Sequence, residues 1–554
     1  MGAILAGATI AEAATLNVDD DNKTGMEDGS AAHPYSTVQK ATDKAAASGD
    51  VIQIAAGTYA GGTKVMNKQV QLLGGFVGGT QAGYAAGTAG DFGARSPTTN
   101  LTRLTGTSTL PALDLHYTKE SVVDGLVLSG GSNGIFTFGE VPAESNPTIS
   151  NNLIEGNGFP GANGKYPAGA GIYAQKGGAT ITGNVIRNNT GDRGAGLASD
   201  CVKLVASGNL IENNIGKADH AGGFNLAGTD ITFTHNVIKG NTSAGLGGGG
   251  MVFQDGNKPA GTTKALMAYN VYTDNLAAST GSAFFVDDGA QVTFDHELVY
   301  KNRCSTAHGE AIYVDGYGTL GTTVRIVNSS IVDNPCVPVN PAVDASTFRI
   351  EHASSVTVEN SIIWGNGKDA TILDNSKLTV RYSITEQAHP GEGNQVVDPL
   401  LADLAAADYH LRSTVGRYAA GQWVRDRASS PAIDAADPAA PFDLEPGPNG
   451  GRANLGNYGN TCEASMGGAG GTAPSGNCAD APPPAFSDAG AGPGGADGGG
   501  MMMADDGGTV NPIDGPSGGC GCRAAARGRR TTPAGLVWLV AGGFGLARGF
   551  RRRR

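Results

Sequence analysis

Asn184-Val-Ile-Arg-Asn-Asn189 is followed by Asn209-Leu-Ile-Glu-Asn-Asn214 and by Asn236-Val-Ile-Lys-Gly-Asn241, and the same pattern recurs along much of the chain. An earlier copy, Asn152-Leu-Ile-Glu-Gly-Asn157, precedes them, and looser copies follow. The copies start 25 to 34 residues apart, and a glycine-rich phrase lies between many of them. A period of this length indicates a solenoid.

The repeat unit is made of strands and turns, because β-branched residues alternate, glycines are frequent and no helical pattern of 11 residues occurs. A unit of this length holds about three short strands and three turns. Stacked units of this kind form a parallel β-helix, in which neighbouring coils supply the hydrogen bonds. Asn tolerates the left-handed conformation of a turn, and its amide can bond the Asn one coil away. We therefore predict a structural Asn column rather than a binding motif.

Composition supports an all-β chain and restricts its partners. The 554 residues include 88 glycines and only 6% aromatic residues, as expected for a turn-rich protein. The net charge of −13 and the pI of about 5.1 argue against nucleic acid as a partner. An acidic surface either holds Ca²⁺ or keeps a secreted protein soluble, and both readings stay open. We expect a monomer.

The repeat also pairs two of the seven cysteines. Cys304 lies two residues after Asn302, and Cys336 lies two residues after Asn334. They therefore occupy one position in consecutive coils, about 5 Å apart. A disulfide requires a similar separation of Cα atoms, and disulfides persist in oxidising compartments. We predict a disulfide between Cys304 and Cys336.

Two segments resemble known β-helix proteins. His33-Pro-Tyr-Ser-Thr-Val-Gln-Lys-Ala41 and Ala56-Gly-Thr-Tyr59 resemble the N-terminal segment of right-handed, pectate-lyase-like β-helix proteins. That resemblance implies a short amphipathic helix over residues 37–47 that caps the solenoid, and it says little about activity. Ser430-Pro-Ala-Ile-Asp-Ala435 resembles the terminal segment of bacterial surface β-helix proteins. We expect an N-terminal cap at 15–60, about a dozen coils over 61–400 and a C-terminal cap at 401–461.

The start of the chain resembles the end of a signal peptide. Residues 4–10 are apolar, and Ala11-Glu-Ala13 has the small-x-small pattern of a cleavage site. We predict a signal peptide over residues 1–14, truncated because its basic region is missing, and hence a secreted protein. The alternative is an apolar N-terminus without a targeting role.

The end of the chain predicts an anchor. Residues 462–532 are rich in Gly, Pro, Ala and Asp, which predicts a disordered linker. Cys520-Gly-Cys522, the short apolar stretch within residues 533–554 and the terminal arginines resemble the MYXO-CTERM sorting signal of myxobacterial surface proteins. That resemblance implies processing at Cys520 or Cys522 and attachment to the cell envelope at the outer surface through a short transmembrane helix. A metal ligand pair or a local disulfide are the alternatives for these cysteines.

The coils can be aligned on the apolar residue of the glycine-rich phrase. The aligned residues, expected to point inward, are Ile172, Leu197, Phe224, Met251, Phe284 and Ile312. Because side chains alternate along a strand, the next residue should point outward. This places Tyr173, Asn225 and Tyr313 on the surface as candidate glycan contacts.

A column of acidic residues lies three positions beyond the aligned residues. Asp287 and Asp315 should stand one coil apart, with Asp255 and Asp288 beside them. Carboxylates this close repel each other, and a cation would relieve the repulsion. Ca²⁺ takes oxygen ligands, so these four residues form a candidate calcium site. The alternative is that the aspartates only form turns.

Arg193 and His220 precede the aligned residues by four positions and complete a polar strip. Such a strip suits an extended glycan, acidic or neutral. We therefore predict a surface-anchored display scaffold or glycan-binding module. The alternative is a Ca²⁺-dependent polysaccharide lyase or glycoside hydrolase acting on an extended acidic glycan, with Arg193, His220, Asp287 and Asp315 as candidate catalytic residues.

Overall fold

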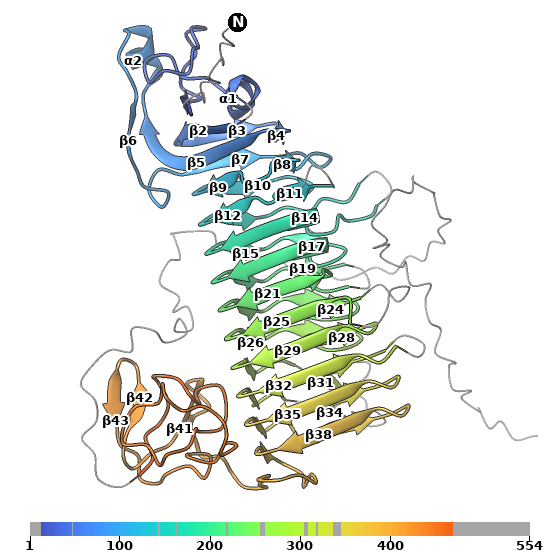
Figure 1. The fold of residues 1–554 in the computed structure, drawn as a ribbon. Coiled ribbons are helices and arrows are strands. Elements are labelled where there is room, and N and C mark those ends of the chain that lie inside the picture. The colour runs from blue at the N-terminus through green and yellow to red at the C-terminus, as the bar shows by residue number, and fades with distance from the viewer. Residues whose placement is uncertain are drawn as a thin grey trace, which may run out of the picture. The chain divides into compact units, whose positions relative to one another are not determined.

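The computed structural model describes residues 13–468, except for 47, 141–144, 162–163, 218–219, 255–260, 304–308, 317–319 and 336–344. Within this part, short strands wind into a parallel β-helix, as the repeat predicts (Figure 1). Cys304, Cys336, Cys520, Cys522, most of the signal peptide and the whole anchor segment 533–554 lie outside the described residues. None of the helices that the structure describes is long and apolar enough to cross a membrane.

Two large sheets and one small sheet run along the solenoid. The first sheet consists of β1 (Thr15–Val18), β2 (Ser48–Ala55), β4 (Thr63–Met66), β5 (Gln69–Gly78), β6 (Asp91–Arg95), β8 (Leu113–His116), β9 (Val122–Asp124), β11 (Ile135–Phe138), β12 (Thr148–Ser150), β14 (Ile172–Thr182), β17 (Leu197–Ser207), β20 (Phe224–Leu226), β21 (Asp230–Thr234), β24 (Gly250–Phe253), β25 (Lys264–Ala268), β28 (Phe284–Asp287), β29 (Gln291–Asp295), β31 (Glu310–Val314), β32 (Thr323–Val327), β34 (Ser346–Ile350), β35 (Ser355–Glu359), β37 (Ala370–Ile372) and β38 (Lys377–Arg381).

In the described part of the chain the second sheet holds twelve strands in coil order, and the nine that lie beyond residue 152 each come from a copy of the Asn repeat. They are β3 (Gly57–Ala60), β7 (Thr102–Thr105), β10 (Val127–Ser129), β13 (Leu153–Glu155), β15 (Val185–Arg187), β18 (Leu210–Glu212), β22 (Val237–Lys239), β26 (Val271–Thr273), β30 (Leu298–Tyr300), β33 (Ser330–Val332), β36 (Ile362–Trp364) and β39 (Ile384–Thr385). The small sheet holds β16 (Thr190–Gly191), β19 (Ile215–Gly216), β23 (Thr242–Ser243) and β27 (Leu276–Ala277).

The inward aliphatic residues of the repeat form one continuous core. Ile186, Ile211 and Ile238 occupy the same position in consecutive coils, and none of them is exposed to solvent. Burial of such side chains stabilises the fold by roughly 1.5 to 3 kcal/mol each. The core therefore depends on stacking, since a single coil would leave these residues in water.

Two columns of buried Asn side chains join the coils, as the repeat predicts. In one column Asn184 Nδ2 donates to Asn209 Oδ1 at 3.0 Å, and in the other Asn189 Nδ2 donates to Asn214 Oδ1 at 3.0 Å. One detail of the prediction is wrong. The left-handed conformation belongs to the residue before the column, such as Asn188 with a φ of 55°, and this frees the column residue to point inward.

The N-terminal end carries the predicted helix. Helix α1 (Val38–Lys44) begins after Thr37, whose side chain accepts a hydrogen bond from Lys40 N. Its buried residues include Val38 and Ala41, which join the core of the solenoid. A second short helix, α2 (Gln81–Ala85), follows β5.

A compact C-terminal segment packs on the outer face of the second sheet. It contains two antiparallel hairpins, formed by β40 (Leu401–Asp403) with β41 (Asp408–Leu411) and by β42 (Arg417–Ala419) with β43 (Gln422–Val424). Its residues Tyr409, Leu411 and Leu455 share an apolar cluster with Val332 and Ile362 of the solenoid.

Candidate functional site

The strand register corrects one position in the alignment of coils. Phe224 pairs with Gly250, and Asn225 pairs with Met251, so Met251 points away from the solenoid core instead of into it. The reason is steric. A Cβ on Gly250 would lie 2.1 Å from Cζ of Phe224, so the Phe ring takes the space of a side chain in the next coil.

The three predicted glycan contacts do point away from the core, but the expectation that they lie on the surface is wrong. Asn225 is 2% exposed, Tyr313 is 6% exposed, and Tyr173 is partly buried. A small apolar cluster accounts for the burial of Tyr313, whose ring stacks on Phe285 with ring centroids 5.0 Å apart. These three residues therefore do not form an open platform for sugars.

The acidic column exists and extends one coil further than the sequence alignment reached. Asp315 N donates to Val286 O at 2.9 Å, and Val314 pairs with Ile350. This register places Asp287, Asp315 and Glu351 at one position in three consecutive coils. Glu351 and its neighbour His352 were missed by the sequence analysis. The motif Phe348-Arg349-Ile350-Glu351 would have revealed them, because it matches Ile312-Tyr313-Val314-Asp315.

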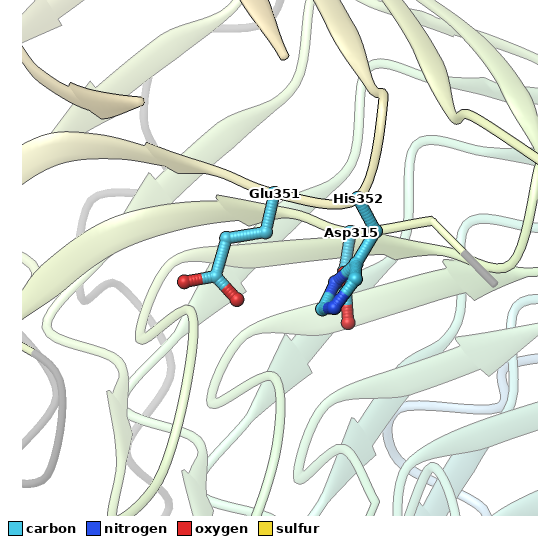
Figure 2. A group of neighbouring side chains, drawn as sticks. All are labelled: Asp315, Glu351 and His352. Atoms are coloured by element: carbon cyan, nitrogen blue, oxygen red, sulfur yellow. The ribbon is translucent and has the colours of Figure 1, made fainter. Parts of the chain in front are cut away.

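A charged cluster lies at the turn that follows β31 and β34. Figure 2 shows the imidazole of His352 against the carboxylate of Asp315, with Glu351 nearby. His352 Nδ1 lies 2.5 Å from Asp315 Oδ1, which also accepts from Gly316 N. An ionised carboxylate can only accept hydrogen bonds, so with Asp315 ionised Nδ1 is the donor. The other ring nitrogen, Nε2, lies 3.6 Å from Asp374 Oδ2.

The members of this cluster differ in their exposure to solvent. Asp315 is 2% exposed, whereas the side chains of His352 and Asp374 are 33% and 58% exposed. A buried carboxylate therefore orients a partly exposed imidazole, and the other ring nitrogen lies next to the exposed carboxylate of Asp374. We name the Asp315, His352 and Asp374 side chains the His352 cluster.

Glu351 is held by two hydrogen-bonding partners behind the His352 cluster. Tyr313 Oη donates to Glu351 Oε2 at 2.7 Å, and Arg349 forms an ion pair with Oε1 at 2.5 Å. Burial raises the pKa of the Tyr313 phenol, and the nearby Asp315 and Glu351 carboxylates add to this effect. The phenol therefore stays protonated and acts as a fixed donor.

A second polar group lies nearer the N-terminus on the same sheet. Tyr173 Oη donates to Asp200 Oδ2 at 2.5 Å, and Gln175 Nε2 donates to Tyr173 Oη at 3.2 Å. Burial raises the pKa of Asp200, against the opposite effects of Tyr173 and of the charge on Arg193. Arg193 thus lies close to this group. His220 is partly exposed, and its carbonyl oxygen accepts a bond from Ser243.

The residues predicted to bind calcium are only partly brought together. Asp255 lies outside the described residues, and Asp287 is fully buried, with Oδ1 accepting from Asp288 N at 2.8 Å. Among the residues that the structure describes, the only group with the spacing of metal ligands is Asp315, Glu351 and His352, whose ligand atoms lie within 4.8 Å of one another.

This group does not favour calcium. Ca²⁺ takes six to eight oxygen ligands, whereas the group offers one imidazole nitrogen. Both oxygens of Glu351 already bind Tyr313 and Arg349, and Asp315 Oδ1 binds His352. We therefore do not assign a calcium site to this group.

Comparisons with known proteins bear on the fold. Residues 111–275 match a family model described as a right handed beta helix region, and residues 368–436 match a model described as disaggregatase related. No curated protein matches the chain. The crystal structure of pectate lyase Pel9A is similar, with 12% sequence identity and a TM-score of 0.41, over 81% of this chain and 97% of that chain.

The protein is therefore a right-handed parallel β-helix. The match over residues 111–275 lies within the regular coils, and it confirms the fold class predicted from the Asn repeat.

Proposed function

We propose that this chain is a surface-anchored β-helix protein that binds an extended polysaccharide next to the His352 cluster. The solenoid presents one set of side chains per coil, about 4.8 Å apart, along a straight edge. Such an edge matches a polymer that repeats along its length better than it matches a compact ligand. The protein would then display a binding surface outside the cell.

One observation carries the proposal: a buried hydrogen-bond network supports a solvent-facing imidazole. Asp315 orients His352, and Tyr313 and Arg349 hold Glu351 in the neighbouring position. Polar groups fixed in this way lose little conformational entropy when they bind a ligand. Sugar hydroxyl groups both donate and accept hydrogen bonds, so His352 and Asp374 suit them as partners.

Binding to immobilised polysaccharides tests the proposal. The panel should include neutral and uronic acid polymers, and the variants His352→Ala and Asp374→Ala should weaken retention at least tenfold on the polymer that binds. Asp230→Ala is the matched control, because Asp230 is also an exposed carboxylate at the end of a turn, at the start of β21. Equal retention of all four proteins would refute the site.

Polysaccharide cleavage is a second candidate function, favoured by the geometry of the same pair. An imidazole that donates through Nδ1 to a buried carboxylate can accept a proton at Nε2, which is what a lyase needs to remove the proton next to a uronate carboxyl group. A lyase would release an unsaturated sugar that absorbs ultraviolet light. Release of this product by the whole protein, and its loss in His352→Ala, would establish catalysis over simple binding.

Surface attachment is part of the proposal and rests on residues 520–554. The cysteine pair, the apolar stretch and the arginines of that segment support anchoring. Changing both Cys520 and Cys522 to Ala, or deleting residues 533–554, should release the protein from the cell surface. Unchanged surface display in both variants would refute this part.

A further inference from the structure

A cleft of about 470 Å³ opens where the solenoid meets its C-terminal segment. Trp364, the last residue of β36, forms one wall. The other wall, which includes Asp398 and Asp403, is β40 with the residues on either side of it, together with Arg412, which follows β41. A volume of this size lies within the range of ligand sites, which is roughly 300 to 1,000 Å³.

The walls of the cleft are held at a fixed separation. Tyr409 Oη donates to Asp333 Oδ2 at 3.3 Å, and Gly456 N donates to Asn360 O at 2.9 Å, so the segment is bonded to two coils. Trp364 also packs against the apolar cluster between solenoid and segment. The cleft is therefore preformed, and a ligand need not bring the walls together.

The side chains of the second wall have polar atoms that can bind a ligand. Asp398 Oδ1 accepts from Leu400 N, and Asp403 Oδ1 accepts from Ala405 N and Ala406 N. Within the described part of the chain, neither Oδ2 atom has a hydrogen-bond partner. Arg412 Nη2 donates to Ala402 O at 3.2 Å, which fixes the guanidinium without neutralising it.

These groups have the chemistry of a sugar-binding site. A partly exposed indole presents a flat apolar face, on which the C–H face of a sugar ring can pack. Two carboxylate oxygens accept bonds from hydroxyl groups, and a guanidinium donates bonds to ring and hydroxyl oxygens. Two carboxylates against one guanidinium give the cleft a net negative charge, which disfavours uronic acids.

We propose that this cleft binds a neutral oligosaccharide, with Trp364 stacking on a sugar ring and Arg412 and Asp403 bonding its hydroxyl groups. It is a second site, because Trp364 belongs to a strand of the second sheet whereas His352 and Asp374 follow strands of the first sheet. The inference rests on the proposed polysaccharide binding. It adds that the cleft would bind neutral sugars, at one end of the polymer or on a side branch.

Calorimetric titration of the whole protein tests the cleft. The probes are cellohexaose, xylohexaose and mannohexaose, with hexagalacturonate as the acidic comparison. At least one neutral probe should bind, and Arg412→Ala and Trp364→Ala should each weaken it at least tenfold. Arg412 is exposed, so its variant should fold even if loss of Trp364 disturbs the apolar cluster.

Different experimental results would refute the two proposed sites. Loss of neutral binding in Arg412→Ala but not in His352→Ala supports the cleft. Loss in His352→Ala alone overturns the cleft and leaves the proposed function standing. The inference is also overturned if no neutral probe binds, or if only hexagalacturonate binds.

Discussion

The side-chain amide of Asn189 donates a 3.0 Å hydrogen bond to Oδ1 of Asn214, which occupies the same position one coil further on. The same oxygen accepts from the backbone N of Asn189 at 3.0 Å. Asn214 in turn donates to Ile186 O and to Asn241 Oδ1, each at 3.0 Å. One buried side chain thus bonds polar groups in the coil before it and in the coil after it.

Replacing Asn214 with Ala should destabilise the protein by about 3 kcal/mol. The substitution removes the side-chain partner of Asn189 N and of Ile186 O and one of the two hydrogen bonds of Asn189 Nδ2, which keeps its bond to Ile154 O. A buried polar group that loses its partner costs roughly 1 to 3 kcal/mol. Denaturant unfolding measures the change. Asn188→Gly is the control, because Asn188 is an exposed turn residue at a φ of 55°, which Gly adopts freely. A loss in Asn214→Ala no larger than in the control would contradict the structural role of the column.

Gly250 should not tolerate a side chain while Phe224 is present. An added Cβ would meet Cζ of Phe224 at 2.1 Å, and Phe224 is fully buried between Phe233 and Phe284. Overpacking of this kind costs roughly 1 to 3 kcal/mol. Gly250→Ala should therefore lower the melting temperature, and adding Phe224→Leu should recover part of the loss.

The control for this pair is Gly93→Ala, whose Cβ would have its nearest neighbour at 3.4 Å. Its melting temperature should change little. If Phe224→Leu lowers the stability of Gly250→Ala further instead of restoring it, the steric account of the register is wrong.

Glu445 should make stability fall with rising pH. Burial raises its pKa from 4.5 to about 7, although Asn454 N, Asn460 N and Asn449 Nδ2 donate to it. The folded state therefore binds the proton more tightly, and its contribution is complete below pH 4.5 and lost as pH rises through about 7. The loss is roughly 3 kcal/mol.

Glu445→Gln removes this titration and should flatten the stability profile over that pH range. Unfolding in denaturant at several pH values, for wild type and variant, measures it. Parallel profiles for the two proteins would show that Glu445 titrates at the same pH in the folded and unfolded chain.

The sequence predicts the stacked coils but not every detail of their strand register. The Asn column follows from spacing alone, because each Asn bonds the one in the next coil. The register at Met251 does not follow from spacing. Four successive glycines, Gly247 to Gly250, allow more than one alignment of this coil with its neighbours, and the size of the Phe224 ring selects the one that the structure has.

The site was predicted less completely for a similar reason. The alternation of side chains correctly places Tyr313 and Asn225 outside the core. An apolar cluster on the outer face nevertheless buries Tyr313, and the repeat pattern does not predict such a cluster. Glu351 and His352 lie in a coil without the glycine-rich phrase, so the alignment stopped at Ile312. The Trp364 cleft depends on a contact between segments far apart in the chain.

Retention of the whole protein on a panel of neutral and acidic polysaccharides tests the central claim most directly, with the length of the polysaccharide chains measured after elution. The account predicts saturable retention on at least one polymer, at least tenfold weaker retention of that polymer by His352→Ala, and chains of unchanged length. Passage through every polymer, or retention that His352→Ala leaves intact, would contradict it. Shortened chains that depend on His352 would replace binding with catalysis as the function of the site.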